Sequence, residues 1–408
     1  MEMGIINKDS SLEELLNADI SEIAGISFYC ETCGKEHSVD IDKIIVEKGA
    51  VNQVSDAVES IVHNINESRK IFLVADNNTY AVCGEKVEGL LKKNGYELKT
   101  FVFKTSKQLV PGEQTLGRLL IEMEKGTSLI VAVGSGVIND MCKYLSYKTD
   151  IPYMIVGTAP SMDGYASSVT PTVVDGIKAT LQGVYPRVII GDLDVLKEAP
   201  MEMIRAGFGD IIGKLVALTD WNLSRKLNGE KYCDTCAEIV KNAIDKCIAN
   251  IEGIKTRDET AIKHLMEALV LAGITMGMFG SSRPASGAEH HFAHYWDEDA
   301  ISRGEEHPLH GNSVGVGTVI ASEIYKLLDD KIPVKVNPPD PLYVKSLLDH
   351  IGACDNPRDL GIRKELFKRS VLYSKDNRTK FTVMHLADQM RLLEEFSEIL
   401  TEKYYGSV

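Results

Sequence analysis

The sequence has little of what marks a secreted, membrane-spanning or nucleic-acid-binding protein. Its N-terminus, M-E-M-G-I-I-N-K-D, has no basic start and no apolar core, so no secretory signal is expected. No apolar run reaches the about 20 residues that cross a bilayer, and the longest, Ala268 to Gly280, predicts a buried helix. The net charge of -14 excludes a general basic surface. We therefore expect a cytoplasmic protein with no nucleic-acid partner and no membrane insertion.

Cysteine is sparse, and the eight residues do not indicate a disulfide framework, because the chain is long and lacks a signal. Cys30 with Cys33, and Cys233 with Cys236, form two C-x-x-C pairs. Together they could make a four-thiolate zinc site, and the first pair with His37 could form half of a zinc finger. The spacing of about 200 residues between the pairs fits no compact zinc module. We therefore expect reduced thiols near the surface.

The length and composition are those of an ordinary globular protein of more than one domain. At 408 residues the chain exceeds one hydrophobic core, so two domains, or three, are expected. The hydrophobic fraction of 44% and the charged fraction of 25% are typical of globular proteins. No internal repeat and no low-complexity segment stands out.

The apolar pattern predicts an α/β half followed by an all-α half. Short apolar runs predict buried strands at 71–75, 97–104, 129–133, 153–157 and 187–192, with helices between them at 51–70, 85–94, 116–125 and up to 145. Such alternation indicates a parallel sheet covered on both faces. From Val195 onward the clearest segments are helical, at 237–251, 258–279, 314–328, 341–350 and 383–402. We place the domain boundary at residue 192, giving domains 1–192 and 193–408.

A glycine turn at Gly134–Gly136 follows one predicted strand and opens a helix. Glycine there lets the backbone approach a phosphate, which the helix N-terminus attracts. The motif is not G-x-G-x-x-G, because Asn139 stands where the third glycine would be. A tight strand-to-helix turn is therefore the alternative.

Two further segments end predicted strands of the same sheet. The loop from Thr158 to Gly164 carries small and hydroxyl-bearing residues, and ligands of such folds bind at the carboxyl edge of the sheet. Asp76 ends an earlier strand, where its carboxylate could accept hydrogen bonds from a ribose and would repel a 2′-phosphate. This favours NAD over NADP, although Asp76 could equally be a turn former.

Histidines are concentrated between Arg283 and Gly317. His290 and His294 are four residues apart and share one face of a helix, while His310 arrives after a polar loop. They could form part of a metal site, which would still need an oxygen ligand. Asp210, within G-F-G-D-I-I-G-K, could supply that oxygen or could cap a helix. Crowding of unrelated histidines is the alternative.

Taken together, these segments resemble the iron-dependent alcohol dehydrogenase superfamily, and within it the sn-glycerol-1-phosphate dehydrogenase family, in particular its bacterial AraM-type branch. The motifs that carry the resemblance are V-G-S-G-V-I-N-D at 133–140, T-A-P-S-M-D-G at 158–164, A-G-F-G-D-I-I-G-K at 206–214, S-R-P-A-S-G-A-E-H-H-F-A-H at 282–294 and H-G-N-S-V-G-V-G at 310–317. The chain departs from the wider superfamily at the glycine turn, where Ser135 and Val137 replace glycine and serine of G-G-G-S.

The resemblance implies a Rossmann-like N-terminal domain and an all-α C-terminal domain, the dehydroquinate synthase-like architecture. It implies a divalent ion, usually zinc with iron or nickel as alternatives, held by Asp210, His290 and His310. It implies catalytic roles near the substrate for Asp210, His294 and Asp163. It implies NAD, with NADP as the alternative, bound by Asp76, Gly134, Ser135, Gly136, Val137, Ile138, Thr158, Ala159, Pro160, Ser161 and Ser167.

The activity implied is metal-dependent, NAD(P)-linked interconversion of sn-glycerol 1-phosphate and dihydroxyacetone phosphate, a small phosphorylated substrate, by a homo-oligomer. Arg283 and Lys214 are candidate phosphate ligands, although both could form ordinary ion pairs, and His291 is expected to be structural. A glycerol or simple alcohol dehydrogenase of the same fold is one alternative, and a dehydroquinate-synthase-like lyase another. Asp210 counts against the lyase, whose metal site resembles Glu-His-His. A non-catalytic nucleotide-binding regulator is disfavoured, because it has no use for an open metal position.

Overall fold

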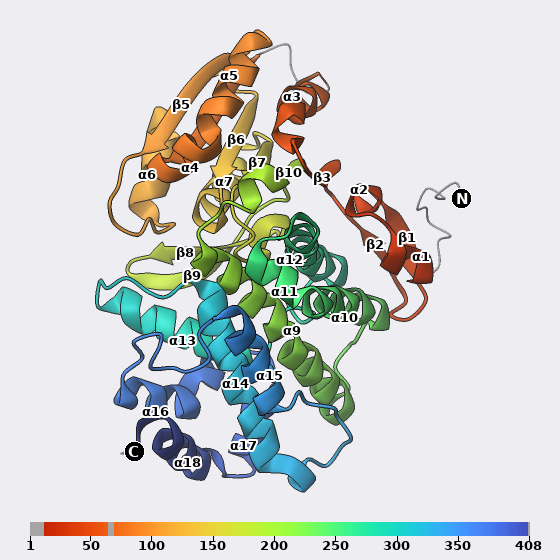
Figure 1. Cartoon of the computed structure of the whole chain (residues 1–408), viewed down its shortest axis with the longest axis vertical. Coiled ribbons are helices and arrows are strands. Elements are labelled where there is room, and N and C mark those ends of the chain that lie inside the picture. Colours follow the sequence, from red (N-terminus) through yellow and green to blue (C-terminus); the bar gives the residue numbers. More distant parts are fainter. Residues whose placement is uncertain (1–11, 64–68, 407–408) are drawn as a thin grey trace.

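The computed structural model describes residues 12–63 and 69–406, and its organising element is a six-stranded parallel sheet (Figure 1). The strand order is β3-β10-β7-β6-β4-β5, and every pairing in it is parallel. The strands are β3 (Lys43–Glu47), β4 (Lys70–Asp76), β5 (Glu97–Phe103), β6 (Leu129–Gly134), β7 (Tyr153–Gly157) and β10 (Val188–Asp192). The α/β prediction for this half is confirmed.

Both faces of the sheet are covered by helices. Successive residues of a strand point to opposite sides, so the apolar strands present two apolar faces that must be buried. One face packs against α3 (Val54–Val62) and α5 (Glu85–Lys93). The opposite face packs against α7 (Gly136–Thr149), α6 (Glu113–Glu122) and α12 (Glu259–Phe279). Since α12 comes from the second half of the chain, one hydrophobic core joins the two halves.

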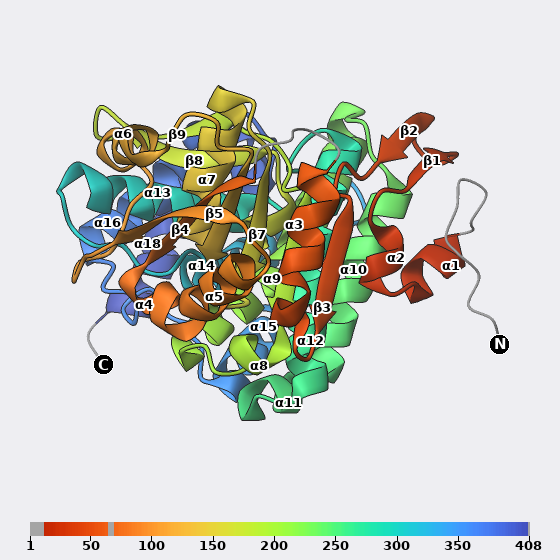
Figure 2. The same ribbon diagram turned by 90° about the horizontal axis from the view of Figure 1, so that it is seen from above.

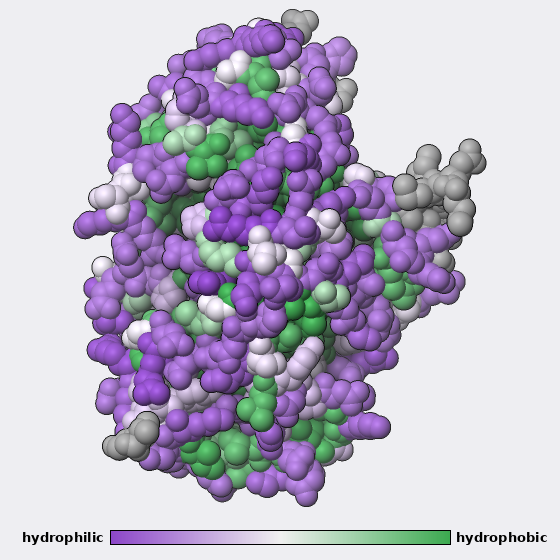
Figure 3. Space-filling view, viewed as in Figure 1, coloured by the Kyte–Doolittle hydropathy of each residue, from purple (hydrophilic) through white to green (hydrophobic). Residues whose placement is uncertain are grey.

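The helix α12 contains the apolar run predicted to be buried. It is long and apolar enough to cross a membrane by length and composition, but 67% of its most apolar window is buried inside the protein. That burial against the sheet identifies it as a core helix and confirms the prediction. Figure 3 shows hydrophilic residues over most of the face of the molecule seen in that view.

After β10 the described chain is helical. The longest helices are α9 (Met201–Asn228), α10 (Asp234–Ala249), α13 (Ala288–Ser302) and α14 (His310–Leu328). Shorter ones complete this half: α8 (Leu193–Leu196), α11 (Ile251–Thr256), α15 (Pro341–Ile351), α16 (Lys364–Tyr373), α17 (Val383–Gln389) and α18 (Leu393–Tyr405). Figure 2 shows α10 and α12 beside β3, at the edge of the sheet. The boundary at residue 192 remains our proposal.

Two antiparallel hairpins were not predicted. The hairpin of β8 (Val169–Val174) and β9 (Ile177–Gln182) extends from the sheet half to α13, where Lys178 Nζ lies 2.6 Å from Asp297 Oδ2. The hairpin of β1 (Ser27–Cys30) and β2 (Lys35–Ser38) follows the short helices α1 (Leu12–Asn17) and α2 (Ile20–Ile23). It packs beside α10 and the end of α12, as both views show (Figures 1 and 2).

Some predicted boundaries are wrong. The helix predicted to extend to Lys70 ends at Val62, and Lys70 begins β4. The helix predicted over 383–402 is two helices, because Arg391 adopts a left-handed backbone (φ 59°) that interrupts the hydrogen-bond ladder. The sequence Ser11-Leu12-Glu13-Glu14 has the form of a capping box and predicts the start of a helix; α1 begins at Leu12, and Ser11 itself lies outside the described residues.

The prediction of surface thiols is wrong for the two C-x-x-C pairs. Cys30, Cys233 and Cys236 are buried, and Cys33 is half-buried. All eight cysteines are free thiols. Sequence distance was a poor guide, because the N-terminal hairpin folds back onto α10 and brings Cys30 Sγ to 3.7 Å from Cys233 Sγ.

Candidate metal and nucleotide site

The helices α9 and α14 cross in backbone contact, and small residues make this approach feasible. A Cβ atom on Gly311 would lie 1.8 Å from the carbonyl oxygen of Ala206. A Cβ atom on Gly207 would lie 1.9 Å from the carbonyl oxygen of Pro160, in the loop after β7. Any larger residue at either position would separate these segments. The glycines therefore set how closely the two helices and the loop after β7 approach.

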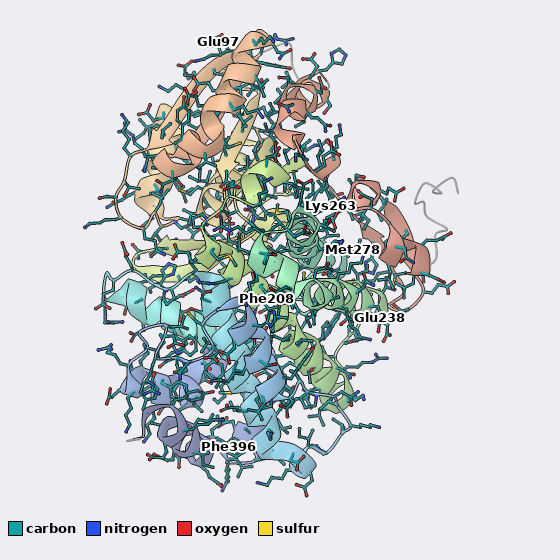
Figure 4. All side chains as sticks on the ribbon, viewed as in Figure 1. Glu97, Phe208, Glu238, Lys263, Met278 and Phe396 are labelled. Carbon is teal, nitrogen blue, oxygen red and sulfur yellow. The ribbon has the colours of Figure 1, made fainter. Side chains whose placement is uncertain are left out.

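This crossing brings together Asp210 of α9, His290 of α13 and His310 of α14. One ligand atom from each lies within 4.8 Å of the others, and His290 Nε2 is 3.8 Å from Asp210 Oδ1. The rings of His290 and His310 have centroids 5.2 Å apart. Figure 4 labels Phe208, two residues before Asp210, near the middle of the molecule. Asp210 lies inside α9, so the helix-cap alternative is wrong.

Glu289 orients the ring of His290. Its Oε1 lies 2.8 Å from His290 Nδ1 and also accepts a hydrogen bond from the Gly287 N–H. We assign the ring proton to Nδ1, which leaves the Nε2 lone pair directed toward Asp210. Burial, aided by the charge of Lys214, lowers the pKa of His290 well below its usual value, so the imidazole is neutral. A neutral, oriented imidazole is the form that binds a metal.

The cluster also contains a buried cation. Lys214 is fully buried between two carboxylates, with Nζ 2.6 Å from Asp163 Oδ2 and hydrogen-bonded to Asp210 Oδ1. The Asp163 N–H donates to Asp210 Oδ2 at 3.0 Å. Burial and the neighbouring Asp163 charge raise the pKa of Asp210, while Lys214 opposes them. Two carboxylates against one ammonium leave an excess of negative charge, which favours a divalent cation.

The donor set fits the metal that the family implies. One carboxylate oxygen and two imidazole nitrogens are ligands used for zinc and for iron, and three protein ligands leave positions open for substrate. Half-buried His310 completes the set from the first turn of α14. The three residues that the resemblance implied are thus brought together from three helices.

His294 lies beside this cluster, one helical turn from His290. Its ring centroid is 6.0 Å from that of His290 and 5.6 Å from that of His310. Burial, with the charge of Lys178, lowers its pKa well below the usual value. By contrast, His291 packs against the ring of His385 at 6.1 Å, on another side of α13, in agreement with the expected structural role.

The two predicted nucleotide loops meet at the carboxyl edge of the sheet. Gly134 ends β6 and pairs with Gly157, the end of β7. Beyond these ends, the hydroxyl oxygens of Ser135 and Ser161 are 3.3 Å apart. The helix α7 begins at Gly136, so its first N–H groups face this edge. The structure therefore places together the residues predicted at 134–138 and 158–161.

The other two predicted nucleotide residues also have structural partners. Asp76 caps α4 (Asn77–Thr79), because its Oδ1 accepts hydrogen bonds from the Asn78 and Thr79 N–H groups. The Ser167 hydroxyl lies 2.9 Å from Nζ of buried Lys143, which also contacts Asp140 Oδ1 at 3.1 Å. Lys143 was not predicted as part of this site. The sequence feature that could have indicated it is the pair Asp140 and Lys143, of opposite charge and three residues apart within an apolar helix.

Neither predicted phosphate cation is available. Lys214 is held by the two aspartates, and Arg283 is bound through two nitrogens to Glu230, with Nε 2.7 Å from Oε1. A cation that was not predicted is Lys380, whose Nζ hydrogen-bonds, within the described part of the chain, to the Ser282 hydroxyl at 2.6 Å and the Ser286 carbonyl at 3.2 Å. Among the ion pairs of the described residues, none involves Lys380. Nothing in the local sequence marks this lysine, because only the fold brings it near the histidines.

Comparisons with known proteins define the class. Residues 45–200 match the family described as iron-containing alcohol dehydrogenase. The glycerol dehydrogenase of Schizosaccharomyces pombe superposes with a TM-score of 0.63 at 19% identity, covering 90% of this chain and 91% of that one. The iron-containing alcohol dehydrogenase of Corynebacterium glutamicum superposes with a TM-score of 0.65 at 16% identity, covering 91% and 97%. The fold is therefore that of these dehydrogenases.

More similar relatives narrow the class to one family. A glycerol-1-phosphate dehydrogenase of Halalkalibacterium halodurans, named for NAD(P)+, is 37% identical over 316 residues, 76% of this chain and 77% of that protein. Its namesake in Bacillus subtilis is 35% identical over 71% of this chain and 73% of that protein. That of Thermococcus kodakarensis is 30% identical over 76% and 82%. The chain belongs to the glycerol-1-phosphate dehydrogenase family.

Proposed function

We propose that the protein interconverts sn-glycerol 1-phosphate and dihydroxyacetone phosphate with NAD(P) and one divalent metal ion. The observation that carries this proposal is the convergence of Asp210, His290 and His310 next to the loops that end β6 and β7. Family membership supports it, since the named activity of the relatives is this dehydrogenase. Zinc is the proposed metal, with iron or nickel as alternatives.

The proposed nucleotide site lies at the carboxyl edge of the sheet. The N–H groups at the start of α7 and the hydroxyls of Ser135 and Ser161 are suited to a pyrophosphate. Asp76 is proposed to bind the ribose through its carboxylate, while also capping α4. Bound NAD(P) would supply the hydride chemistry, while the protein fixes distance and angle.

A divalent ion at the cluster would supply Lewis-acid polarisation of the substrate oxygen. The protein's own side chains orient the proposed metal ligands and transfer the proton of the reacting hydroxyl. Glu289 keeps Nε2 of His290 unprotonated, and Lys214 balances part of the charge of Asp163 and Asp210. Neutral His294, one turn away, is proposed to take or return the proton of the reacting hydroxyl.

Lys380 is proposed to bind the substrate phosphate. It is half-buried and makes no ion pair among those of the described residues. Burial, and next the charge of Arg283, lowers the pKa of Lys380 to about 7. The charge of Lys380 in turn helps to lower the pKa of His290. A cation without a carboxylate partner, near the metal cluster, suits an anionic substrate better than free glycerol.

The decisive assay is NADH-dependent reduction of dihydroxyacetone phosphate, with chiral identification of the glycerol phosphate formed. Formation of sn-glycerol 1-phosphate supports the proposal. Activity with glycerol or dihydroxyacetone alone would decide for the alcohol dehydrogenase. Turnover without net change in NADH would decide for a lyase, which returns its hydride in each cycle.

The remaining proposals concern the assembly and its location. We propose a homo-oligomer in the cytoplasm, with the nucleotide domain ending at residue 192. Size-exclusion chromatography with light scattering tests the first of these, and limited proteolysis around 192 tests the boundary.

A further inference from the structure

We propose a second metal site, structural and specific for zinc, formed by Cys30, Cys33, His37 and Cys233. One ligand atom from each of these residues lies within 4.8 Å of the others. Cys30 ends β1, Cys33 lies in the hairpin turn, and His37 is in β2. Cys233 is the N-cap of α10, about 200 residues away in sequence but in contact through the fold.

Three distances between the donor atoms agree with a tetrahedron around zinc. With Zn–S of about 2.3 Å and Zn–N of about 2.0–2.1 Å, a tetrahedral site places sulfurs about 3.8 Å apart and sulfur about 3.5 Å from nitrogen. In the structure, Cys30 Sγ and Cys233 Sγ are 3.7 Å apart. His37 Nε2 is 3.4 Å from both Cys33 Sγ and Cys233 Sγ. These three distances match a tetrahedral zinc site, and the remaining donor–donor distances lie within 4.8 Å.

The histidine is oriented as a metal ligand. His37 Nδ1 lies 2.7 Å from the carbonyl oxygen of Met278, which can only accept a hydrogen bond. We therefore assign the ring proton to Nδ1, so the lone pair of Nε2 points at the two sulfurs. Figure 4 labels Met278, at the end of α12 beside the hairpin. A ligating histidine that donates its other N–H to a backbone carbonyl is the usual arrangement around zinc.

The sulfurs have hydrogen-bond donors of their own. The hydroxyl of Thr32 lies 3.1 Å from Cys30 Sγ and can donate to it, while the Thr235 hydroxyl, 3.3 Å from the same sulfur, accepts its S–H. The Cys236 N–H donates to Cys233 Sγ at 3.4 Å. Such donors stabilise thiolates, which are the metal-binding form of cysteine. This assigns Cys236 a supporting role and leaves one thiol from the second C-x-x-C pair as the ligand.

A disulfide accounts for fewer of these contacts. Joining Cys30 to Cys233 would require the sulfurs to approach to about 2.05 Å, and it would leave Cys33 and His37 without a shared partner. Zinc uses all four donors. Because four protein ligands close the coordination shell, the site has no position for substrate, which indicates a structural role.

The structural role of the zinc site follows from the segments that it would join. An isolated two-stranded hairpin is at best marginally stable in water. Zinc would fix β1 and β2 to the N-terminus of α10, with the end of α12 supporting the histidine. The site would thereby hold the N-terminal segment against the helical half of the protein.

Spectroscopy of the full-length protein, purified from cells grown with cobalt in place of zinc, tests the proposal. Cobalt at the cysteine cluster gives a thiolate-to-metal charge-transfer band in the near ultraviolet, together with intense tetrahedral bands in the visible. Cobalt at Asp210, His290 and His310 gives no thiolate band, so the two sites are separated without any mutation. Absence of the thiolate band overturns the proposal.

Metal analysis of variants gives a second test. In His290→Ala/His310→Ala protein expressed with zinc, about one zinc per chain is expected to remain, because the cysteine cluster is intact. Adding Cys33→Ser should remove it, whereas adding Cys354→Ser, a half-buried cysteine outside the cluster, should not. A zinc-free double variant, or a Cys30–Cys233 disulfide in the purified protein, overturns the proposal. Because neither readout depends on activity, failure here is distinct from failure of the proposed dehydrogenase function.

Discussion

The backbone N–H of Asp163 donates a hydrogen bond to Asp210 Oδ2 at 3.0 Å. Asp163 belongs to the loop that follows β7, and Asp210 lies inside α9. The bond therefore ties the edge of the nucleotide sheet to a predicted metal ligand in the helical half. Lys214 reinforces the connection, since its ammonium contacts both side chains. A change in this loop is expected to alter the metal site directly.

Removal of a metal ligand is expected to abolish turnover while the fold is retained. For His290→Ala or Asp210→Ala we predict a fall in kcat/KM of roughly 10²-fold or more, since Lewis-acid stabilisation is worth several kcal/mol. Steady-state assays and circular dichroism provide the measurement. His350→Ala is the matched control, because that surface histidine pairs with Glu252. Full activity after rigorous removal of metal would contradict the mechanism.

Glu289→Gln is expected to weaken metal binding without removing a ligand. The amide keeps an acceptor for His290 Nδ1, but it cannot carry the negative charge that Glu289 gains as pH rises through its pKa, which burial raises to about 8. That charge makes the imidazole bind a metal more strongly. Loss of such an outer partner lowers metal affinity by about 10- to 100-fold. Competition with a chelator of known affinity measures the change. An unchanged affinity would show that Glu289 serves packing alone.

Lys380→Met is expected to raise KM for dihydroxyacetone phosphate by about 10- to 100-fold, because a hydrogen bond to a charged group is worth about 1.5–3 kcal/mol. Activity with unphosphorylated dihydroxyacetone should change little. Lys368→Met is the control, since that exposed lysine pairs with Glu398. Equal losses with both substrates would argue for a general structural effect.

The same lysine predicts a pH dependence. Burial lowers the pKa of Lys380 to about 7, so the ammonium is charged below that pH and neutral above it. Wild-type KM for the phosphorylated substrate is therefore expected to rise as pH increases through about 7. The Lys380→Met variant should lose this rise. Persistence of the same rise in the variant would place its origin elsewhere.

Gly311→Ala is expected to destabilise the protein strongly. The new Cβ would lie 1.8 Å from the Ala206 carbonyl oxygen, which is backbone and cannot rotate away. We predict a loss of about 3 kcal/mol or more in the free energy of unfolding. In contrast, Gly117→Ala in α6 meets nothing within 4 Å and should stabilise by about 0.5–1 kcal/mol. Denaturant titrations of the two variants measure the difference.

The strands of the central sheet could be predicted because they are buried on both faces. The strand β7 has the predicted bounds, β4 is one residue longer than predicted at each end, and β6 is one residue longer at its C-terminal end. Continuous apolar runs specify this environment. The helix α9 was harder to predict from the sequence. Its glycines at 207, 209 and 213 look like turn residues, but they serve close helix approach. Tertiary packing offsets the low helix propensity of glycine there.

Local pattern determined the α/β and helical halves, and the family motifs predicted Asp210, His290 and His310 as metal ligands, three residues whose ligand atoms the fold brings within 4.8 Å of one another. Only the tertiary structure decided which cations are paired, since Arg283 is held by Glu230 while Lys380 contacts the Ser282 hydroxyl and the Ser286 carbonyl. It also decided that Cys233 joins Cys30, Cys33 and His37. The physical reason is the same in both cases. Charge pairing and metal geometry depend on distances between segments far apart in the chain, and no local periodicity encodes those distances.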